Sequence, residues 1–347
     1  MKDMFEDMVE RLLGDLVTAE RVMAAERGDW PSEIWDALEE QGLTLAAVPE
    51  ALGGVGGSWH DAFVLIRAAG RHCAPVPLAE TIGVNWLLGR AGMAGVAGPA
   101  TLAVADKAVL DGAHFSGEIA DVPWGRSVRL VLVRCAAPDD AKLVLLDTRG
   151  AAVQPGINIA REARDRLTFD RAPIIAEIAG ASGPEDEILL LCGASIRSAQ
   201  IAGGLQRLLA TTIDYANQRV QFGRPIGKFQ AIQHQIALLA EQAGIATAAA
   251  ETAFANVHPM PHLQAVATAK SVASEAAGAG AAIAHGVLGA IGFTYEHALQ
   301  LTTRRLWSWR SEFGSQSYWA TRLGEATCRV GADGFWSALT AGALGAA

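Results

Sequence analysis

Apolar residues recur every three to four positions over about the first hundred residues, which is the spacing of one face of a helix. Met4, Met8, Leu12 and Leu16 form the first such stripe, and they predict a helix that buries this face. Further helices are expected to open at Pro31, to run from His60 to Gly70, and to pass through Trp86 and Leu88. The glycine-rich stretch 53–57 follows no predicted strand, so we interpret it as a turn between helices.

The pattern changes at about Gly98. From Thr101 to Asp170, short β-rich runs alternate with Gly, Pro and Asp turn residues, which predicts a small antiparallel sheet or barrel. From Glu185 onward the helical period returns in long segments rich in Ala and Leu. We therefore expect an α+β chain with three domains. These are an N-terminal helical domain (residues 1–98), a middle β domain (99–184) and a C-terminal helical bundle (185–347).

The segment 215–233, YANQRVQFGRPIGKFQAIQ, separates two of the long C-terminal helices and is called the corner segment below. Gly223 and Pro225 end the first helix, and the second is expected to start after Gly227. The polar and aromatic side chains between them are Arg219, Gln221, Phe222, Arg224, Lys228 and Gln230. Guanidinium groups bind phosphate oxygens in pairs and amides bind ring edges, so the set suits an anionic, planar ligand. Composition alone favours a solvated helix hairpin instead.

Charge and cysteine content narrow the classes of protein to which the chain can belong. The net charge of -9 and the pI near 5.4 argue against a nucleic-acid or anionic-membrane protein. Acidic residues near Met1 are not what an export signal carries. The most apolar run, Ile188 to Ala202, is interrupted by Arg197 and Ser198, so we expect no membrane insertion. The four cysteines lie far apart and favour reduced thiols in a cytoplasmic protein.

Three ordered blocks resemble the acyl-CoA dehydrogenase family. The first is Arg219-Val220-Gln221-Phe222-Gly223, followed by Phe229-Gln230, which resembles the family's arginine, any residue, glutamine, phenylalanine, glycine signature. The second is the Pro-Glu and glycine-rich turn within residues 42–59, and the third is the stretch 289–305, with its Gly-Phe-Thr and following acidic residue. Together the blocks span most of the chain.

The resemblance implies a chemistry and a set of partners. In the family, flavin adenine dinucleotide (FAD) accepts a hydride from the β carbon of an acyl-CoA thioester while a glutamate removes the α proton, leaving a trans-2-enoyl-CoA. Family members bind each flavin across a subunit boundary, so the chain is expected to work in a homo-oligomer or hetero-oligomer. Electron-transfer flavoprotein is the expected electron acceptor.

The resemblance also implies cofactor-binding residues. Arg219 would bind the pyrophosphate of a neighbour's FAD, and Phe222 and Gln230 would contact that cofactor. Gln221 and Gly289 lie in the matched blocks, and Ser315 aligns with the last residue of a Glu-Gly-Thr motif that the family carries further on; all three are assigned to the cofactor as well. Trp124, in a loop of the β domain, either packs beside the flavin ring or has a plain packing role.

The catalytic glutamate does not match. The family's two known positions for it correspond here to Arg197 and Phe313. Glu312 lies one residue early and is the candidate base, although on a helix that shift turns a side chain by about 100°. Glu296 occupies an acidic family position with a structural role. Two further family residues, the glutamine before the C-terminal glycine pair and the second of those glycines, are replaced by Gly286 and Ala290.

This pattern resembles the short subunits of heteromeric acyl-CoA dehydrogenases that process steroid side chains or cyclic acyl-CoA substrates, in which one chain supplies the base and the other completes its partner's cofactor site. The first hypothesis is therefore a dehydrogenase subunit, acting in a homo-oligomer with Glu312 or as the supporting chain of a hetero-oligomer. The second is a degenerate scaffold or regulator that binds no flavin. A third keeps the fold and flavin but changes the reaction, as in an oxidase or a monooxygenase-like enzyme.

Overall fold

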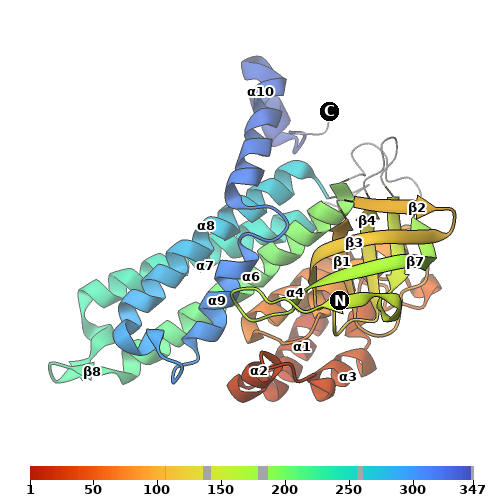
Figure 1. Cartoon of the computed structure of the whole chain (residues 1–347). Helices are drawn as coiled ribbons and strands as arrows, with labels where there is room; N and C mark the ends of the chain where they lie inside the picture. Colours follow the sequence, from red (N-terminus) through yellow and green to blue (C-terminus); the bar gives the residue numbers. More distant parts are fainter. Residues whose placement is uncertain (106, 136–141, 179–186, 256–260, 345–347) are drawn as a thin grey trace. The chain divides into compact units, whose positions relative to one another are not determined.

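The computed structural model describes residues 1–105, 107–135, 142–178, 187–255 and 261–344. The chain divides into two compact units. The first contains residues 1–65 and 75–196, and the second contains residues 66–74 and 197–347. Each unit is described separately (Figure 1).

Helices form the N-terminal part of the chain. They are α1 (Lys2–Leu16), α2 (Ala19–Ala25), α3 (Ser32–Glu40), α4 (Trp59–His72) and α5 (Leu78–Arg90), with short 3-10 helices η1 (Leu43–Leu45) and η2 (Glu50–Leu52). The helices and the glycine turn are where the sequence predicts them. The stripe predicted for α1 is wrong, because Phe5, Val9 and Leu13 are buried and Met4 is exposed. The two stripes have the same spacing and differ by one residue, so periodicity does not choose between them. The face that carries Phe5 is the buried one because the Phe5 ring packs against the turn at Gly57.

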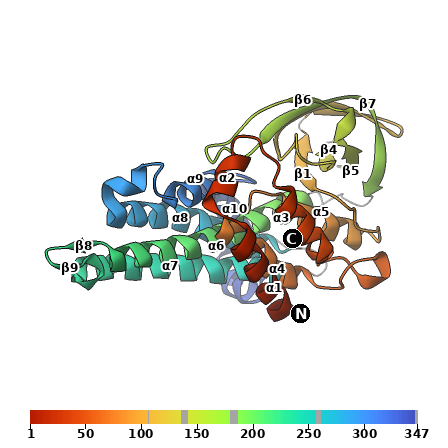
Figure 2. The same ribbon diagram turned by 90° about the horizontal axis from the view of Figure 1, so that it is seen from below.

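The sheet of the first unit contains β1 (Ala100–Ala105), β2 (Lys107–Asp111), β3 (His114–Pro123), β4 (Leu130–Cys135), β5 (Lys142–Asp147), β6 (Ala152–Gln154) and β7 (Arg164–Ile178). The strand order is β1-β4-β5-β7-β3-β2, with β6 paired to β7. Figure 2 shows the long β7 curving along this sheet. The expected antiparallel pairing holds except between β1 and β4, which are parallel. The parallel pair arises because β1 enters directly from the helical region and lies against β4, not against its sequence neighbour β2.

The second unit is a bundle of long helices. Its elements are α6 (Ile188–Gln218), which begins in the first unit, α7 (Gln230–Ala255), α8 (Leu263–Leu288), η6 (Gly289–Phe293), α9 (Leu299–Trp309) and α10 (Gln316–Thr340). Helices α6, α7 and α8 run side by side along the bundle (Figures 1 and 2). Their core alternates large Leu with small Ala, so the helix axes approach closely. Leu205, Leu239 and Ala277 are among its fully or almost fully buried members.

Two helical stretches are more apolar than we expected. By length and composition alone, Ile188–Gln218 and Leu263–Phe293 both qualify as possible membrane spans, which corrects the expectation that Arg197 and Ser198 interrupt the first. One arginine and one serine do not lower the mean hydropathy of the first stretch enough to exclude it. In the first stretch 94% of the apolar window is buried in the protein, as in the core helix of a folded domain, against 44% in the second. Such stretches are weak evidence for a membrane.

N-terminal helices, a small sheet and a C-terminal helical bundle are the predicted fold class, and it is confirmed. The domain boundaries at residues 98 and 184 stay a prediction. The compact units follow a different division, since residues 66–74 belong with the bundle.

Within the bundle, the end of α4 crosses α6 at two glycines. A Cβ placed on Gly203 would lie 1.9 Å from the carbonyl oxygen of Arg67, and one on Gly70 would lie 2.1 Å from that of Gln200. Backbone atoms line both places, so no rotamer change relieves the clash. The crossing therefore depends on glycine for close approach.

We expect Gly203→Ala to lower the free energy of unfolding by about 3 kcal/mol, because α4 and α6 must move apart. Gly244→Ala in α7 is the matched control. It also replaces a helical glycine, but nothing lies within 4 Å of the added Cβ. Its higher helix propensity should leave stability unchanged or raise it by up to about 1 kcal/mol. Denaturant titration of both variants measures the difference, and equal stabilities would contradict the close crossing.

Candidate functional site

The corner segment folds into a short hairpin at one end of the bundle. Helix α6 ends at Gln218 and α7 begins at Gln230, close to the predicted limits. Between them lie β8 (Val220–Gln221), β9 (Arg224–Pro225) and η5 (Ile226–Lys228). Phe222 and Gly223 both have positive φ, of 51° and 77°, which is the backbone of a tight two-residue hairpin turn.

The side chains of the corner segment face outward. Phe222 is 93% exposed and meets the Phe229 ring edge-on, with ring centroids 6.1 Å apart. The Arg224 guanidinium lies over the Phe229 ring, 4.3 Å from its centroid. Arg219 is exposed too, and neither arginine forms an ion pair with another residue that the structure describes. The hairpin thus presents positive charge and an aromatic ring that the chain itself does not cover.

The predicted cofactor residues separate into three places. Arg219, Gln221, Phe222 and Gln230 share the exposed corner segment. Gly289, with φ of 64°, opens η6 just after α8. The chain beyond η6 reaches the same end of the bundle, because His297 packs edge-on against Tyr215 of α6. The remaining two residues lie elsewhere.

Ser315 caps the start of α10, where its hydroxyl accepts a hydrogen bond from the Tyr318 backbone N–H at 3.3 Å. Trp124 belongs to the first unit. It has a positive φ of 59°, and its backbone N–H donates to the Ala163 carbonyl at 3.1 Å. Arg126, two residues after Trp124, forms an ion pair with the fully buried Asp165 at 2.5 Å. Trp124 is therefore held in an unusual backbone conformation by its own loop.

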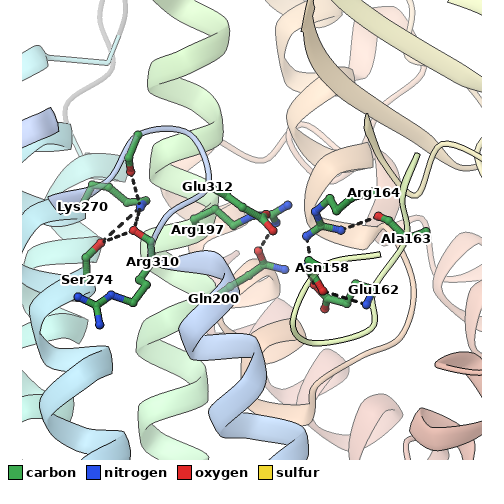
Figure 3. Close-up of polar contacts among 11 residues, drawn as sticks. Asn158, Glu162, Ala163, Arg164, Arg197, Gln200, Lys270, Ser274, Arg310 and Glu312 are labelled. Atoms are coloured by element: carbon green, nitrogen blue, oxygen red, sulfur yellow. Dashed lines mark hydrogen bonds and ion pairs between the residues drawn. The ribbon is translucent and has the colours of Figure 1, made fainter. Parts of the chain in front are cut away.

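A second cluster within the bundle joins α6 to the turn between α9 and α10 (Figure 3). Arg197 has no exposed surface, and its Nε donates to Glu312 Oε2 at 2.7 Å. Its Nη1 donates to Gln200 Oε1 at 2.5 Å, and its guanidinium lies 5.5 Å from the Phe313 ring centroid. The two family positions for a catalytic base, occupied here by Arg197 and Phe313, thus converge on one place.

The cluster lies far along α6 from the corner segment. Arg197 and Gln218 are separated by 21 residues of one continuous helix, which is about 32 Å at 1.5 Å per residue. One protomer therefore does not bring Arg219 close to Glu312. Residues at both ends of the bundle serve one cofactor only if a second protomer supplies one of them.

Lys270 of α8 was not singled out from the sequence. Its side chain is fully buried, and its Nζ donates to the carbonyls of Arg310 at 2.9 Å and Gly314 at 2.8 Å and to Ser274 Oγ at 3.3 Å (Figure 3). Burial lowers the pKa of this ammonium to about 7, while Glu312 opposes the shift. A lone lysine in an alanine-rich helix predicts a solvated position, and nothing in its spacing indicates otherwise.

A polar cluster in the first unit has a structural role. The buried Arg164 donates to Glu162 Oε2 and to the Ala163 carbonyl, and Asn158 donates its side-chain N–H to the same carboxylate (Figure 3). These contacts close the loop that leads into β7. They also fix the carbonyl of Ala163 that accepts the Trp124 N–H.

Comparison with known proteins identifies the family. The acyl-CoA dehydrogenase N-terminal domain matches residues 1–96, and the acyl-CoA dehydrogenase C-terminal domain matches residues 194–325. The chain is 32% identical to the acyl-CoA dehydrogenase IpdE2 of Mycobacterium tuberculosis over 297 residues, which is 82% of each protein. It belongs to the acyl-CoA dehydrogenase family.

Two further comparisons extend this result. The chain is 32% identical over 307 residues to the acyl-CoA dehydrogenase FadE34 of M. tuberculosis, covering 84% of this chain but only 41% of FadE34. A solved structure of a variant of the Tcur3481-Tcur3483 steroid ACAD matches with a TM-score of 0.82 at 26% identity, covering 93% of this chain and 96% of that one. The predicted family is thus confirmed, while the roles of individual site residues stay predictions.

The buried ion pair leads to a stability prediction. Glu312→Ala leaves the Arg197 guanidinium without this carboxylate, and we expect a loss of about 3 kcal/mol, near the low end for broken buried pairs because Glu312 keeps 19% of its side-chain surface exposed. The double variant Arg197→Met with Glu312→Ala removes the cation as well and should recover most of the loss. Urea titration of the single and double variants measures this coupling. A double variant as unstable as Glu312→Ala would contradict a charge-based explanation.

Proposed function

We propose that this chain is the supporting subunit of a FAD-dependent acyl-CoA dehydrogenase that works as a hetero-oligomer. The complex would convert an acyl-CoA thioester to its trans-2-enoyl-CoA. In this assembly, a related subunit supplies the catalytic base, and the corner segment of this chain completes that subunit's cofactor site. The Arg197–Glu312 ion pair is the observation that carries the proposal.

The ion pair weighs against Glu312 as the base. A base must accept a proton from the substrate, and protonation of Glu312 would remove the negative charge that pairs with Arg197 at 2.7 Å. Arg197 has no exposed surface, so solvent does not take over the stabilisation of its charge. The family position on α6 that holds a glutamate elsewhere holds this arginine instead. The arginine at this family position is thereby paired with Glu312, the candidate base of this chain.

The corner segment fits one part of FAD. A pyrophosphate carries negative charge that arginine binds through paired N–H donors. The exposed Arg219 offers such donors, and Gln221 and Gln230, both exposed, offer amide groups. Phe222 offers a ring face or edge to a planar group. When bound, FAD supplies the hydride acceptor, and the residues of this chain bind and orient it.

Relatives support the class of substrate and the two-chain assembly. IpdE2 and FadE34 are acyl-CoA dehydrogenases, and the Tcur3481-Tcur3483 structure is that of a steroid ACAD named from two components. We therefore propose a bulky, steroid-derived acyl-CoA as the substrate class and electron-transfer flavoprotein as the electron acceptor. We place the complex in the cytoplasm.

Two alternative functions fit the observed contacts less well than the supporting-subunit proposal. A homo-oligomer that uses Glu312 as its base requires the carboxylate to leave Arg197 during turnover. A scaffold without flavin leaves the outward cations of the corner segment without a ligand. The supporting-subunit proposal accounts for both observations together.

We expect the complex formed by co-expression with a base-bearing family member to contain flavin, seen by its visible absorbance. Arg219→Ala in this chain should lower flavin retention roughly tenfold or more, because a charge-assisted hydrogen bond contributes about 1.5 to 3 kcal/mol. Arg329→Ala, which removes an exposed arginine of α10, is the control and should leave retention unchanged. A complex that forms without any flavin would favour the scaffold.

Addition of acyl-CoA should bleach the flavin colour of the complex. With the base in the partner subunit, Glu312→Gln in this chain should bleach at a rate within about twofold of the wild type. Glutamine removes the negative charge but keeps the shape of the side chain and an oxygen that accepts the hydrogen bond from Arg197 Nε, so it disturbs the cluster less than alanine does. Loss of bleaching in Glu312→Gln would identify Glu312 as the base and overturn the supporting role.

A further inference from the structure

The turn between α9 and α10 has an unfavourable backbone conformation that other parts of the protein must stabilise. Phe313 and Gly314 are consecutive residues with positive φ, of 52° and 92°. A left-handed conformation is unfavourable for phenylalanine, so it persists only where surrounding contacts require it. This turn also carries Glu312, which pairs with Arg197. Whatever fixes the turn therefore fixes the ion pair.

Side chains from two helices hold the carbonyls of this turn. Lys270 Nζ donates to the carbonyls of Arg310 and Gly314, which lie on either side of Glu312 and Phe313. Ser274 Oγ donates to the Arg310 carbonyl at 3.1 Å, and the indole Nε1 of Trp319 donates to the Phe313 carbonyl at 2.9 Å. Lys270 is the only charged donor among these three. It is also the one that bridges both ends of the turn.

We propose that Lys270 is the positioning residue of the α9–α10 turn. Anchored in α8, its ammonium group draws the carbonyls of Arg310 and Gly314 to one point and so sets where Glu312 and Phe313 meet Arg197. The inference goes beyond the proposed function, because it concerns what holds the turn and not which subunit supplies the base.

The hold on the turn should depend on pH. The charged groups acting on Lys270 are Glu312 and Arg310 from the turn and Arg197 from α6. Burial is the largest influence and lowers the pKa to about 7, against an ordinary value of 10.5. Below pH 7 the ammonium donates three hydrogen bonds and attracts Glu312. Above it the neutral amine keeps two donors and loses that attraction, so an opening of the turn that leaves Lys270 buried in the bundle should become easier.

Global stability should change with pH in the opposite sense. Between pH 7 and 10.5 the unfolded chain binds a proton at Lys270 that the folded chain does not. Stability relative to a variant without the lysine therefore rises with pH across this window and is lowest below it. A side chain that merely filled space would change neither quantity with pH.

Hydrogen exchange of the full-length chain, followed by mass spectrometry at pH 6 and pH 8.5 with correction for intrinsic rates, tests the proposal. In the wild type, protection of a peptide spanning residues 309–319 should fall about tenfold between the two pH values. Lys270→Met should lack this protection at both pH values, and Lys270→Arg, which stays charged, should keep a protection that does not vary with pH. Lys107→Met, at an exposed lysine of β2, should behave as the wild type.

Equal protection of this peptide in the wild type and Lys270→Met at pH 6 would overturn the proposal. If Lys270→Met does not fold, hydrogen exchange of the wild type alone still tests the proposal. A turn that exchanges in the wild type at pH 6 at its intrinsic rate would overturn the proposal as well, because the contacts of Lys270 with the Arg310 and Gly314 carbonyls would then not hold it. The measurement needs neither flavin nor a partner subunit. A colourless co-expressed complex would therefore defeat the proposed function and leave this inference standing.

Discussion

The bundle depends on how it accommodates the buried positive charge of Arg197. Arg197 lies fully inside the protein, within an apolar helical stretch, and a guanidinium there is tolerated only if a carboxylate and further acceptors surround it. Glu312 supplies the charge, Gln200 supplies an amide oxygen, and Phe313 covers the group. The turn between α9 and α10 must then take a left-handed backbone, which Lys270 and Trp319 hold from α8 and α10. A single arginine thereby constrains four helices.

The same constraint bears on the family position that the resemblance assigns to a glutamate on α6, which is Arg197 in this chain. A glutamate on α6 would point a carboxylate toward the place now held by Arg197, whereas here the acidic group at that place is already neutralised. The cations that the chain leaves uncovered lie about 32 Å away along α6, where the corner segment presents them beside an exposed aromatic ring. The proposed role in a shared cofactor site rests on these two features, the paired charges inside the bundle and the uncovered cations at the corner segment.

Much of this was accessible from the sequence because local rules decide it. Gly223 and Pro225 end α6 and set the hairpin of the corner segment, and the change of hydrophobic period near Gly98 separates helices from sheet. The three sequence blocks identified the family. The face of α1 was predicted wrongly, because two stripes one residue apart are equally periodic and only the contact of Phe5 with the turn at Gly57 distinguishes them. The parallel pairing of β1 with β4 was likewise a matter of long-range contact.

By itself, then, the sequence determined the family, the order of helices and strands, and the cationic corner between α6 and α7, since each follows from residues close together in the chain. Only the tertiary structure decided that Glu312 faces Arg197 and that Lys270 is a buried donor to the turn beyond α9. These partners lie 115 and 40 residues apart. The charge of a side chain is written in the sequence, but its burial and its partners exist only once distant helices have packed together.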